Sequence, residues 1–164
     1  MKKLFLILIL IIYALSVPSF VFALTSPELK IWKVNPFTRC PICGEYFTIG
    51  NNQNLSNLDL VYGAYLQDNQ YNLYLFGSSG TSITLFGEKD FGTKSGFLTI
   101  IKKDDNPVYI TDLENFLPDS WTEIGMLDQI SGGYRAYYHP YPDFGKWVTS
   151  VKWGNFKSHN KTIK

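Results

Sequence analysis

Two short runs of alternating apolar residues, joined by four small residues, place the strongest constraint on the fold of this 164-residue chain. Residues 71–76 read YNLYLF, residues 81–86 read TSITLF, and the linker between them reads GSSG. Side chains on a strand alternate between its two faces, so each run has one apolar face. We therefore predict a β-hairpin in which the two runs pair. The apolar residues that would lie opposite each other are Tyr71, Leu73 and Leu75 in the first run and Ile83 and Leu85 in the second.

Other parts of the chain repeat this strand pattern. Aromatic residues make up 16% of the sequence, and it contains 13 Gly and 8 Pro, which is typical of a β-rich domain with many turns. Residues 27–36 predict an edge strand, because Lys30 and Lys33 interrupt the apolar residues and Asn35-Pro36 forms a turn. Further strands are expected at residues 45–49, 61–66, 97–101, 108–111, 134–138 and 147–153.

One segment has the signals of a helix. Ser120 and Glu123 have the spacing of a capping box, and Gly132-Gly133 would end the helix. Gly125 lowers the helix propensity by about 1 kcal/mol relative to Ala. The apolar residues recur every three positions, at Trp121, Ile124, Leu127 and Ile130. The sequence as a whole predicts an α+β fold dominated by antiparallel β-strands and hairpins, with one or two short helices.

The N-terminal segment, residues 1–23, predicts a secretory signal peptide. Lys2 and Lys3 precede an uncharged apolar run, and a small-residue cleavage site ends at Ala23. The alternative is an uncleaved membrane anchor, because a spanning helix needs about 20 apolar residues and the apolar character continues to Leu24. We expect a periplasmic or secreted protein.

The charge of the remaining chain excludes some partners. Removing Lys2 and Lys3 leaves 13 of the 15 basic residues against 14 acidic ones, so the net charge is close to −1. A chain of this charge is a poor partner for nucleic acid, and a membrane contact is expected only if the signal stays uncleaved. We expect a single β-rich domain at residues 24–156 and a flexible tail at residues 157–164.

The only two cysteines, Cys40 and Cys43, stand in the segment Cys-Pro-Ile-Cys-Gly. Pro41 fixes its φ and Gly44 can adopt a positive φ, so the turn can direct N–H groups at both sulfurs and stabilise thiolates. An exported chain meets oxidants, so a structural disulfide is an alternative to metal binding. Redox catalysis is a third interpretation, but it requires a helix after the first cysteine, whereas residues 44–49 have strand character.

The number of available ligands favours copper over zinc. A tetrahedral zinc site needs four ligands, and only His139 and His159 could complete the cysteine pair. Cu(I) is a soft ion that two thiolates and one further ligand can hold, and Met126 or His139 could be that ligand. The alternative roles are a core position in the predicted helix for Met126 and a surface turn for His139.

A different function would use aromatic side chains on the surface. Six aromatic residues near the C-terminus could stack on sugars or contact a protein, although strand cores use the same residue types: Tyr134, Tyr137, Tyr138, Tyr141, Trp147 and Trp153. No motif for catalysis is found, because the Gly-Thr-Lys-Ser-Gly segment lacks the order of a nucleophile elbow. We therefore expect a protein that is not an enzyme.

Three segments in sequence order resemble those of one known family. Residues 40–44 resemble a Cys-x-x-Cys-Gly-Met opening, residues 85–91 an aromatic-Asp-Gly-x-Lys-Asp segment, and residues 108–112 an Ile-Tyr-Val-Thr-Asp strand. Together they resemble the NosL-type nitrous-oxide-reductase accessory proteins, which are exported copper(I) chaperones. The resemblance implies Cu(I) storage or transfer with an exported metalloprotein as partner. The alternative is a secreted structural or interaction module, with a disulfide between the cysteines and an aromatic face for a glycan or protein.

Overall fold

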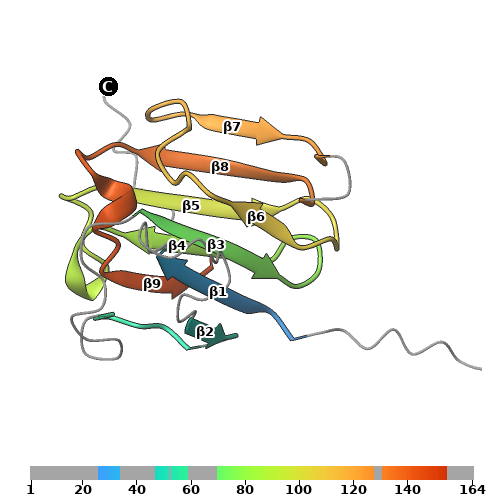
Figure 1. Cartoon of the computed structure of the whole chain (residues 1–164), viewed down its shortest axis with the longest axis horizontal. Coiled ribbons are helices and arrows are strands. Elements are labelled where there is room, and N and C mark those ends of the chain that lie inside the picture. The colour runs from blue at the N-terminus through green and yellow to red at the C-terminus, as the bar shows by residue number, and fades with distance from the viewer. Residues whose placement is uncertain (1–25, 34–46, 52, 59–69, 128–130, 155–164) are drawn as a thin grey trace, which may run out of the picture.

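The computed structural model describes residues 26–33, 47–51, 53–58, 70–127 and 131–154. Over these residues the fold is mostly antiparallel β, as predicted, and consists of two sheets (Figure 1). We call the four-stranded sheet, with strand order β2-β1-β3-β6, sheet A, and the five-stranded sheet, with order β7-β8-β5-β4-β9, sheet B. In Figure 1 the strands of sheet B follow one another from β7 at the top to β9 at the bottom.

Sheet A contains β1 (Glu28–Lys33), β2 (Phe47–Gly50), β3 (Tyr71–Phe76) and β6 (Val108–Ile110). Sheet B contains β4 (Ser82–Phe86), β5 (Phe97–Lys102), β7 (Trp121–Ile124), β8 (Tyr134–His139) and β9 (Ser150–Trp153). Two 3₁₀ turns, η2 (Lys89–Phe91) and η3 (Phe144–Lys146), complete the elements. None of the described segments forms a helix of seven residues or more, and none could cross a membrane as a helix.

The hydrophobic core lies between the two sheets. Leu73 of β3 and Ile110 of β6 face it from sheet A, and Leu85 of β4 and Leu98 of β5 face it from sheet B. Each of these strands alternates between a core face and an outer face, as the period of two predicts. Burial of apolar side chains from both sheets in one cluster stabilises their packing.

The predicted hairpin of residues 71–76 and 81–86 is wrong in its pairing. Both runs form strands, β3 and β4, but they belong to different sheets. The partner of β4 along the chain is β5, with Phe86 opposite Phe97 and Ser82 opposite Ile101. The apolar faces of β3 and β4 still meet, because both face the core from opposite sides rather than pairing through the backbone.

The linker between β3 and β4 explains why the chain changes sheet. Gly77 has φ 127°, a conformation that requires glycine, and it begins a five-residue connection instead of a tight two-residue turn. The linker is bound to the loop after β5, because the Ser79 N–H donates to Asp105 Oδ1 at 2.8 Å and the Gly80 N–H donates to the Lys102 carbonyl at 2.9 Å. That loop in turn carries the chain from β5 in sheet B to β6 in sheet A.

The helix predicted from Ser120 is also wrong over the described residues. Trp121–Ile124 form β7, which pairs with β8 in antiparallel register. Glu123 does not cap a helix; its carboxylate pairs with the Lys103 ammonium at 2.8 Å. The β-branched Thr122 and Ile124 favour a strand, and pairing with β8 adds backbone hydrogen bonds that the local helix signals do not outweigh. The last predicted helical positions, 128–130, lie outside the described residues.

The strand predicted at residues 27–36 forms over Glu28–Lys33, but it is not an edge strand. β1 lies between β2 and β3, and its two lysines do not mark an edge. Lys30 pairs with Glu28 at 3.2 Å, and the Lys33 ammonium donates to the Lys146 carbonyl at 2.9 Å. The remaining described strands form close to their predicted positions, except that residues 147–149 precede β9 rather than belong to it.

Several predictions concern residues outside the described ranges. They are the signal segment 1–23, the strand at residues 61–66, the tail at 157–164, and both cysteines, Cys40 and Cys43.

Candidate functional site

A row of aromatic side chains crosses the outer face of sheet B. Tyr134, Ala136 and Tyr138 of β8 are buried in the core, so the alternate residues of this strand face outward. The Tyr137 ring lies 5.5 Å from the Trp121 ring and 5.8 Å from the Phe97 ring, measured between centroids. His139 stacks on the other side of the row, 5.4 Å from Phe97. We call Trp121, Tyr137, Phe97 and His139 the aromatic strip.

Trp121 is the exposed end of the strip. It retains 42% of its accessible surface, so part of its ring is available to a ligand. It lies on β7, directly opposite Tyr137 in the β7–β8 ladder. The guanidinium carbon of Arg135 lies 4.8 Å from the centre of the Trp121 ring. The indole is therefore exposed to solvent but held on two sides by neighbouring side chains.

The charged groups around the strip form close pairs. His139 Nδ1 lies 2.6 Å from Asp119 Oδ1, and the Lys103 ammonium lies 2.8 Å from the Glu123 carboxylate. Burial raises the pKa of Tyr137 above its usual value, and the nearby Asp119 carboxylate raises it further. The strip thus presents a neutral phenol beside a carboxylate, a combination that can both donate and accept hydrogen bonds.

A glycine shapes the end of the strip next to Phe97. Gly96 has φ 80°, and a Cβ at this position would lie 2.8 Å from the Tyr141 Cβ and 2.9 Å from the His139 carbonyl oxygen. Only glycine fits both the backbone conformation and this close approach. The exposed Tyr141 therefore lies against the end of the strip, beside His139.

The six aromatic residues that the sequence suggested for a binding face do not lie on one surface. Tyr134 and Tyr138 are buried in the core, and Trp153 packs against it. Tyr137 lies in the strip and Tyr141 beside it. Trp147 is exposed but lies elsewhere, about 6 Å from the Lys33 ammonium of β1.

Sequence reasoning missed Trp121 as a member of this surface and Phe97 as the buried ring, 5% exposed, that stacks with Tyr137 and His139. Trp121 was assigned to a helix, and Phe97 was treated only as part of a strand. The alternation of residues 134–139 contains a usable signal, because it separates Arg135, Tyr137 and His139 from their buried neighbours. Strand pairing then places Trp121 beside Tyr137, and this pairing is not visible in the sequence.

Two of the metal ligands predicted from the sequence, Cys40 and Cys43, lie outside the described residues. Met126 lies two residues after Ile124, which pairs with Tyr134 at the start of β8. His139 lies at the other end of β8. At about 3.4 Å per residue they are roughly 17 Å or more apart, so a single ion cannot bind both. Within the described ranges, no three His, Cys, Asp or Glu side chains gather into a metal-binding cluster.

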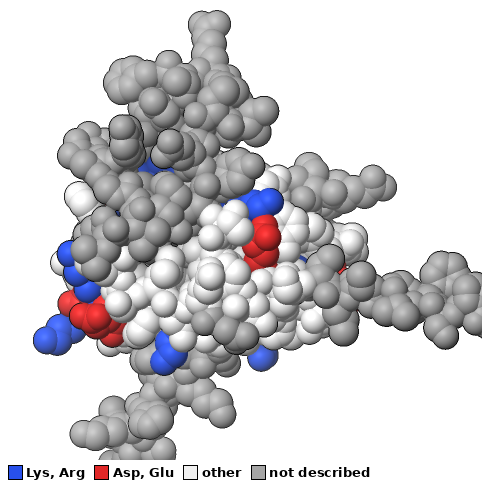
Figure 2. All heavy atoms as spheres, turned by 90° about the horizontal axis from the view of Figure 1, so that it is seen from below, with Lys and Arg blue, Asp and Glu red and all other residues white. Residues whose placement is uncertain are grey.

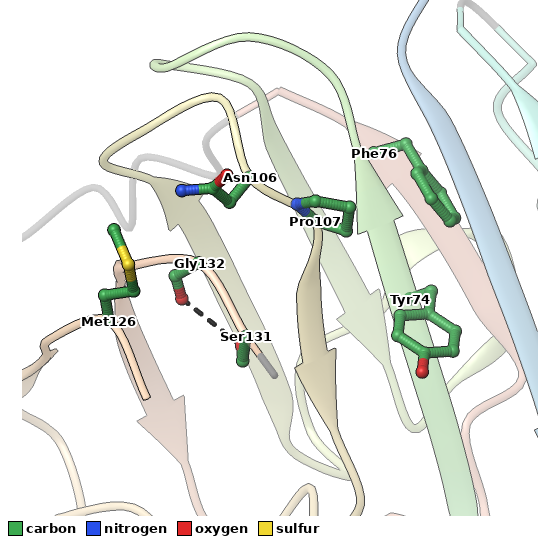
Figure 3. A pocket seen from close by; sticks show the side chains of 7 residues that line it. All are labelled: Tyr74, Phe76, Asn106, Pro107, Met126, Ser131 and Gly132. Carbon is green, nitrogen blue, oxygen red and sulfur yellow. Dashed lines mark hydrogen bonds between the residues drawn. The ribbon is translucent and has the colours of Figure 1, made fainter. Parts of the chain in front are cut away.

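Met126 lies in a separate groove. Instead of occupying a helix core, it is 58% exposed. The groove has a volume of about 430 Å³ and lies between the loops that flank β6 and β7 (Figure 3). Its lining residues are Tyr74, Phe76, Asn106, Pro107, Met126, Ser131 and Gly132. The Ser131 hydroxyl accepts a hydrogen bond from the Tyr109 N–H at 3.0 Å, so this loop covers part of the free edge of β6.

Charge is sparse on the side of the molecule where β2 and β9 lie. Figure 2 shows scattered Lys, Arg, Asp and Glu there among uncharged side chains, with both signs present over the described residues. Among the described residues visible in Figure 2, there is no concentrated patch of one sign of the kind that an electrostatic contact to nucleic acid would require.

No family model matches the chain, and neither a curated protein nor a solved structure matches it. The resemblance to the NosL-type proteins therefore stays a prediction that depends on three short segments.

Proposed function

We propose that this chain is an exported, non-enzymatic glycan-binding module and that the aromatic strip on sheet B is its binding surface. The observation that carries the proposal is Trp121: a large aromatic side chain, 42% exposed, on a strand, and held between Tyr137 and Arg135. A partly exposed indole combines a large apolar ring with a polar N–H, which suits it to contact a ligand.

The chemistry of the strip suits a sugar. One face of a pyranose ring is lined by C–H groups, which pack on the flat face of an indole or phenol, and its hydroxyl groups need polar partners at the edge. The strip supplies both kinds of contact. The Trp121 and Tyr137 rings, whose planes are tilted by 60° to each other, provide the aromatic faces, and the His139–Asp119 pair provides polar atoms at their side.

The scaffold supports binding because it fixes the strip in advance. Trp121 and Tyr137 stand on paired strands, so their separation is set by the β7–β8 register rather than by a loop. Side chains that are already ordered lose little conformational entropy when a ligand binds.

The test measures binding of the purified protein to a panel of soluble polysaccharides, first by retardation in affinity gels and then by titration calorimetry. Trp121→Ala is expected to weaken binding at least tenfold, about 1.4 kcal/mol. Trp147→Ala is the matched control, because Trp147 is also exposed (56%, against 42% for Trp121) but lies away from the strip, and this variant is expected to bind as the wild type does.

Two results would refute the proposal. One is the absence of retardation by every polysaccharide in the panel. The other is equal loss of binding in both tryptophan variants, which would mean that any exposed indole contributes nonspecifically. Circular dichroism of both variants checks that they remain folded.

A second function, Cu(I) binding, depends on the sequence observation that an exported chain contains its only two cysteines as Cys-Pro-Ile-Cys-Gly. Two thiolates and one further soft ligand satisfy Cu(I). Titration of the reduced protein with Cu(I) against a competing chelator tests this function, with Cys40→Ser as the comparison. Binding that is no tighter in the wild type than in Cys40→Ser would exclude it, whereas Trp121→Ala should leave it unchanged.

A further inference from the structure

The residue next to the exposed indole, Arg135, indicates which class of glycan the strip selects. We propose that the strip prefers acidic glycans and that Arg135 binds the carboxylate of a uronic acid whose ring packs on the strip. This inference depends on the proposed glycan-binding function and specifies its ligand.

Arg135 lies beside Trp121, at the exposed end of the strip. It lies on β8, two residues before Tyr137 and on the same outward face. Its partner residue on β7 is Glu123. Arg135 is exposed, and its guanidinium carbon lies 4.8 Å from the centre of the Trp121 ring. A ligand that packs on the strip therefore meets this guanidinium.

The charges around Arg135 are already paired with other groups. Glu123, the nearest carboxylate by strand register, is bound to Lys103 at 2.8 Å. Asp119 is bound to His139 at 2.6 Å. Among the described residues, Arg135 makes no ion pair, and its guanidinium lies over the Trp121 ring. Of the positive groups near the strip that the structure describes, Arg135 is left without an anionic partner by these pairs.

Arg135 is exposed and makes no ion pair among the described residues, so its hydrogen-bond donors are available to a ligand. A guanidinium that stacks on an aromatic ring uses its flat face, whereas its five N–H donors lie in its plane and point outward. Two of them match the two oxygens of a carboxylate, and such paired charge-assisted bonds are stronger than those to neutral oxygens. A hexuronic acid carries its carboxylate directly on the sugar ring, so one ring can contact the aromatic strip and the guanidinium together.

The test compares two forms of one polymer, polygalacturonate and its fully methyl-esterified derivative, which share a backbone and differ in charge. The wild type is expected to bind polygalacturonate at least ten times more tightly than the ester at low ionic strength. Arg135→Gln is expected to bind both forms with the weaker affinity. Lys152→Gln is the matched control, because it removes one positive charge from an exposed position of the same sheet, remote from Trp121. It is expected to keep the tenfold preference.

The outcomes separate this inference from the function on which it depends. If the wild type binds both polymers, or neutral polysaccharides, equally well and Trp121→Ala abolishes that binding, glycan binding stands and the acidic preference is wrong. If Arg135→Gln weakens binding to both polymers by the same factor, Arg135 only positions Trp121, and the inference is likewise overturned. If no polysaccharide binds, the proposed function itself fails.

Discussion

At the scale of single residues, two ionisable side chains in the core link stability to pH. Tyr134 faces the core from β8 and is only 6% exposed, and burial raises its pKa to about 12. Lys102, its cross-strand neighbour on β5, is 2% exposed. The Lys102 ammonium reaches across to sheet A, where it donates to the Leu75 carbonyl at 3.5 Å, and it also donates to the carbonyl of Asn106. One buried cation thus connects both sheets.

We predict that Tyr134 destabilises the fold at alkaline pH. The unfolded tyrosine ionises near pH 10, whereas the folded one stays neutral to about pH 12, so its contribution to stability is intact below pH 10 and is lost between pH 10 and 12. The loss should be on the order of 2 kcal/mol. Urea unfolding of the wild type and Tyr134→Phe across this range measures it, and a constant difference between the two proteins would contradict the prediction.

The pH dependence expected from Lys102 has the opposite sign. Burial lowers its pKa below the usual 10.5, although the Asp104 and Asp105 carboxylates oppose this shift. The folded state therefore releases this proton at a lower pH than the unfolded state, so stability should increase as the pH rises toward 10.5. The free energy of unfolding of the wild type relative to Lys102→Met should increase from neutral pH toward that value. Lys152→Met, at an exposed lysine, is the control, and the same trend in both variants would refute the assignment to Lys102.

At the scale of elements, β7 shows where local sequence signals mislead. The capping-box spacing of Ser120 and Glu123 and the three-residue apolar period both predict a helix, yet Trp121–Ile124 form a strand. The Ser120 hydroxyl donates to the Leu117 carbonyl instead of accepting from a helix N-terminus. The exposed side chains of β7 alternate with half-buried ones, and this weak period of two, rather than the period of three, matches the element that β8 stabilises.

The hairpin of β4 and β5 should depend on Gly96. Gly96→Ala is predicted to destabilise the protein by at least about 1–2 kcal/mol, because its positive φ disfavours a side chain and its Cβ would collide with Tyr141 and the His139 carbonyl. Gly125→Ala is the matched control, since a Cβ there meets open space, and it should change stability by less than about 0.5 kcal/mol. The melting temperatures of both variants are measured by thermal unfolding. Equal melting temperatures would contradict the role assigned to Gly96.

At the scale of the whole molecule, the two sheets share one core and should unfold together. Leu73 of sheet A and Leu98 of sheet B are both fully buried in the same hydrophobic cluster. Replacing either with Ala should cost about 2–5 kcal/mol, through lost burial and the cavity left behind. Each variant should keep a single unfolding transition when tryptophan fluorescence and circular dichroism are compared. Two separate transitions in either variant would show that the sheets are independent units.

Strand positions over most of the described chain can be predicted from local sequence patterns. Residues 71–76 and 134–138 show the period of two of a strand, and the apolar run at residues 97–101 indicates a strand that is buried on both faces. Both patterns are local and can be read without knowing the partner strands. The sequence also identified Tyr137 and His139 as surface candidates, and export and the cysteine motif stay predictions from sequence alone.

Strand pairing depends on tertiary contacts, and so does the set of side chains that meet on the outer face of each sheet. The adjacent runs at β3 and β4 separate into two sheets, and β7 joins β8 although its local signals favour a helix. The strip exists because that pairing places Trp121 between Tyr137 and Arg135. Register depends on contacts between segments distant in the sequence, and their free energy exceeds the local preferences that a sequence pattern reports.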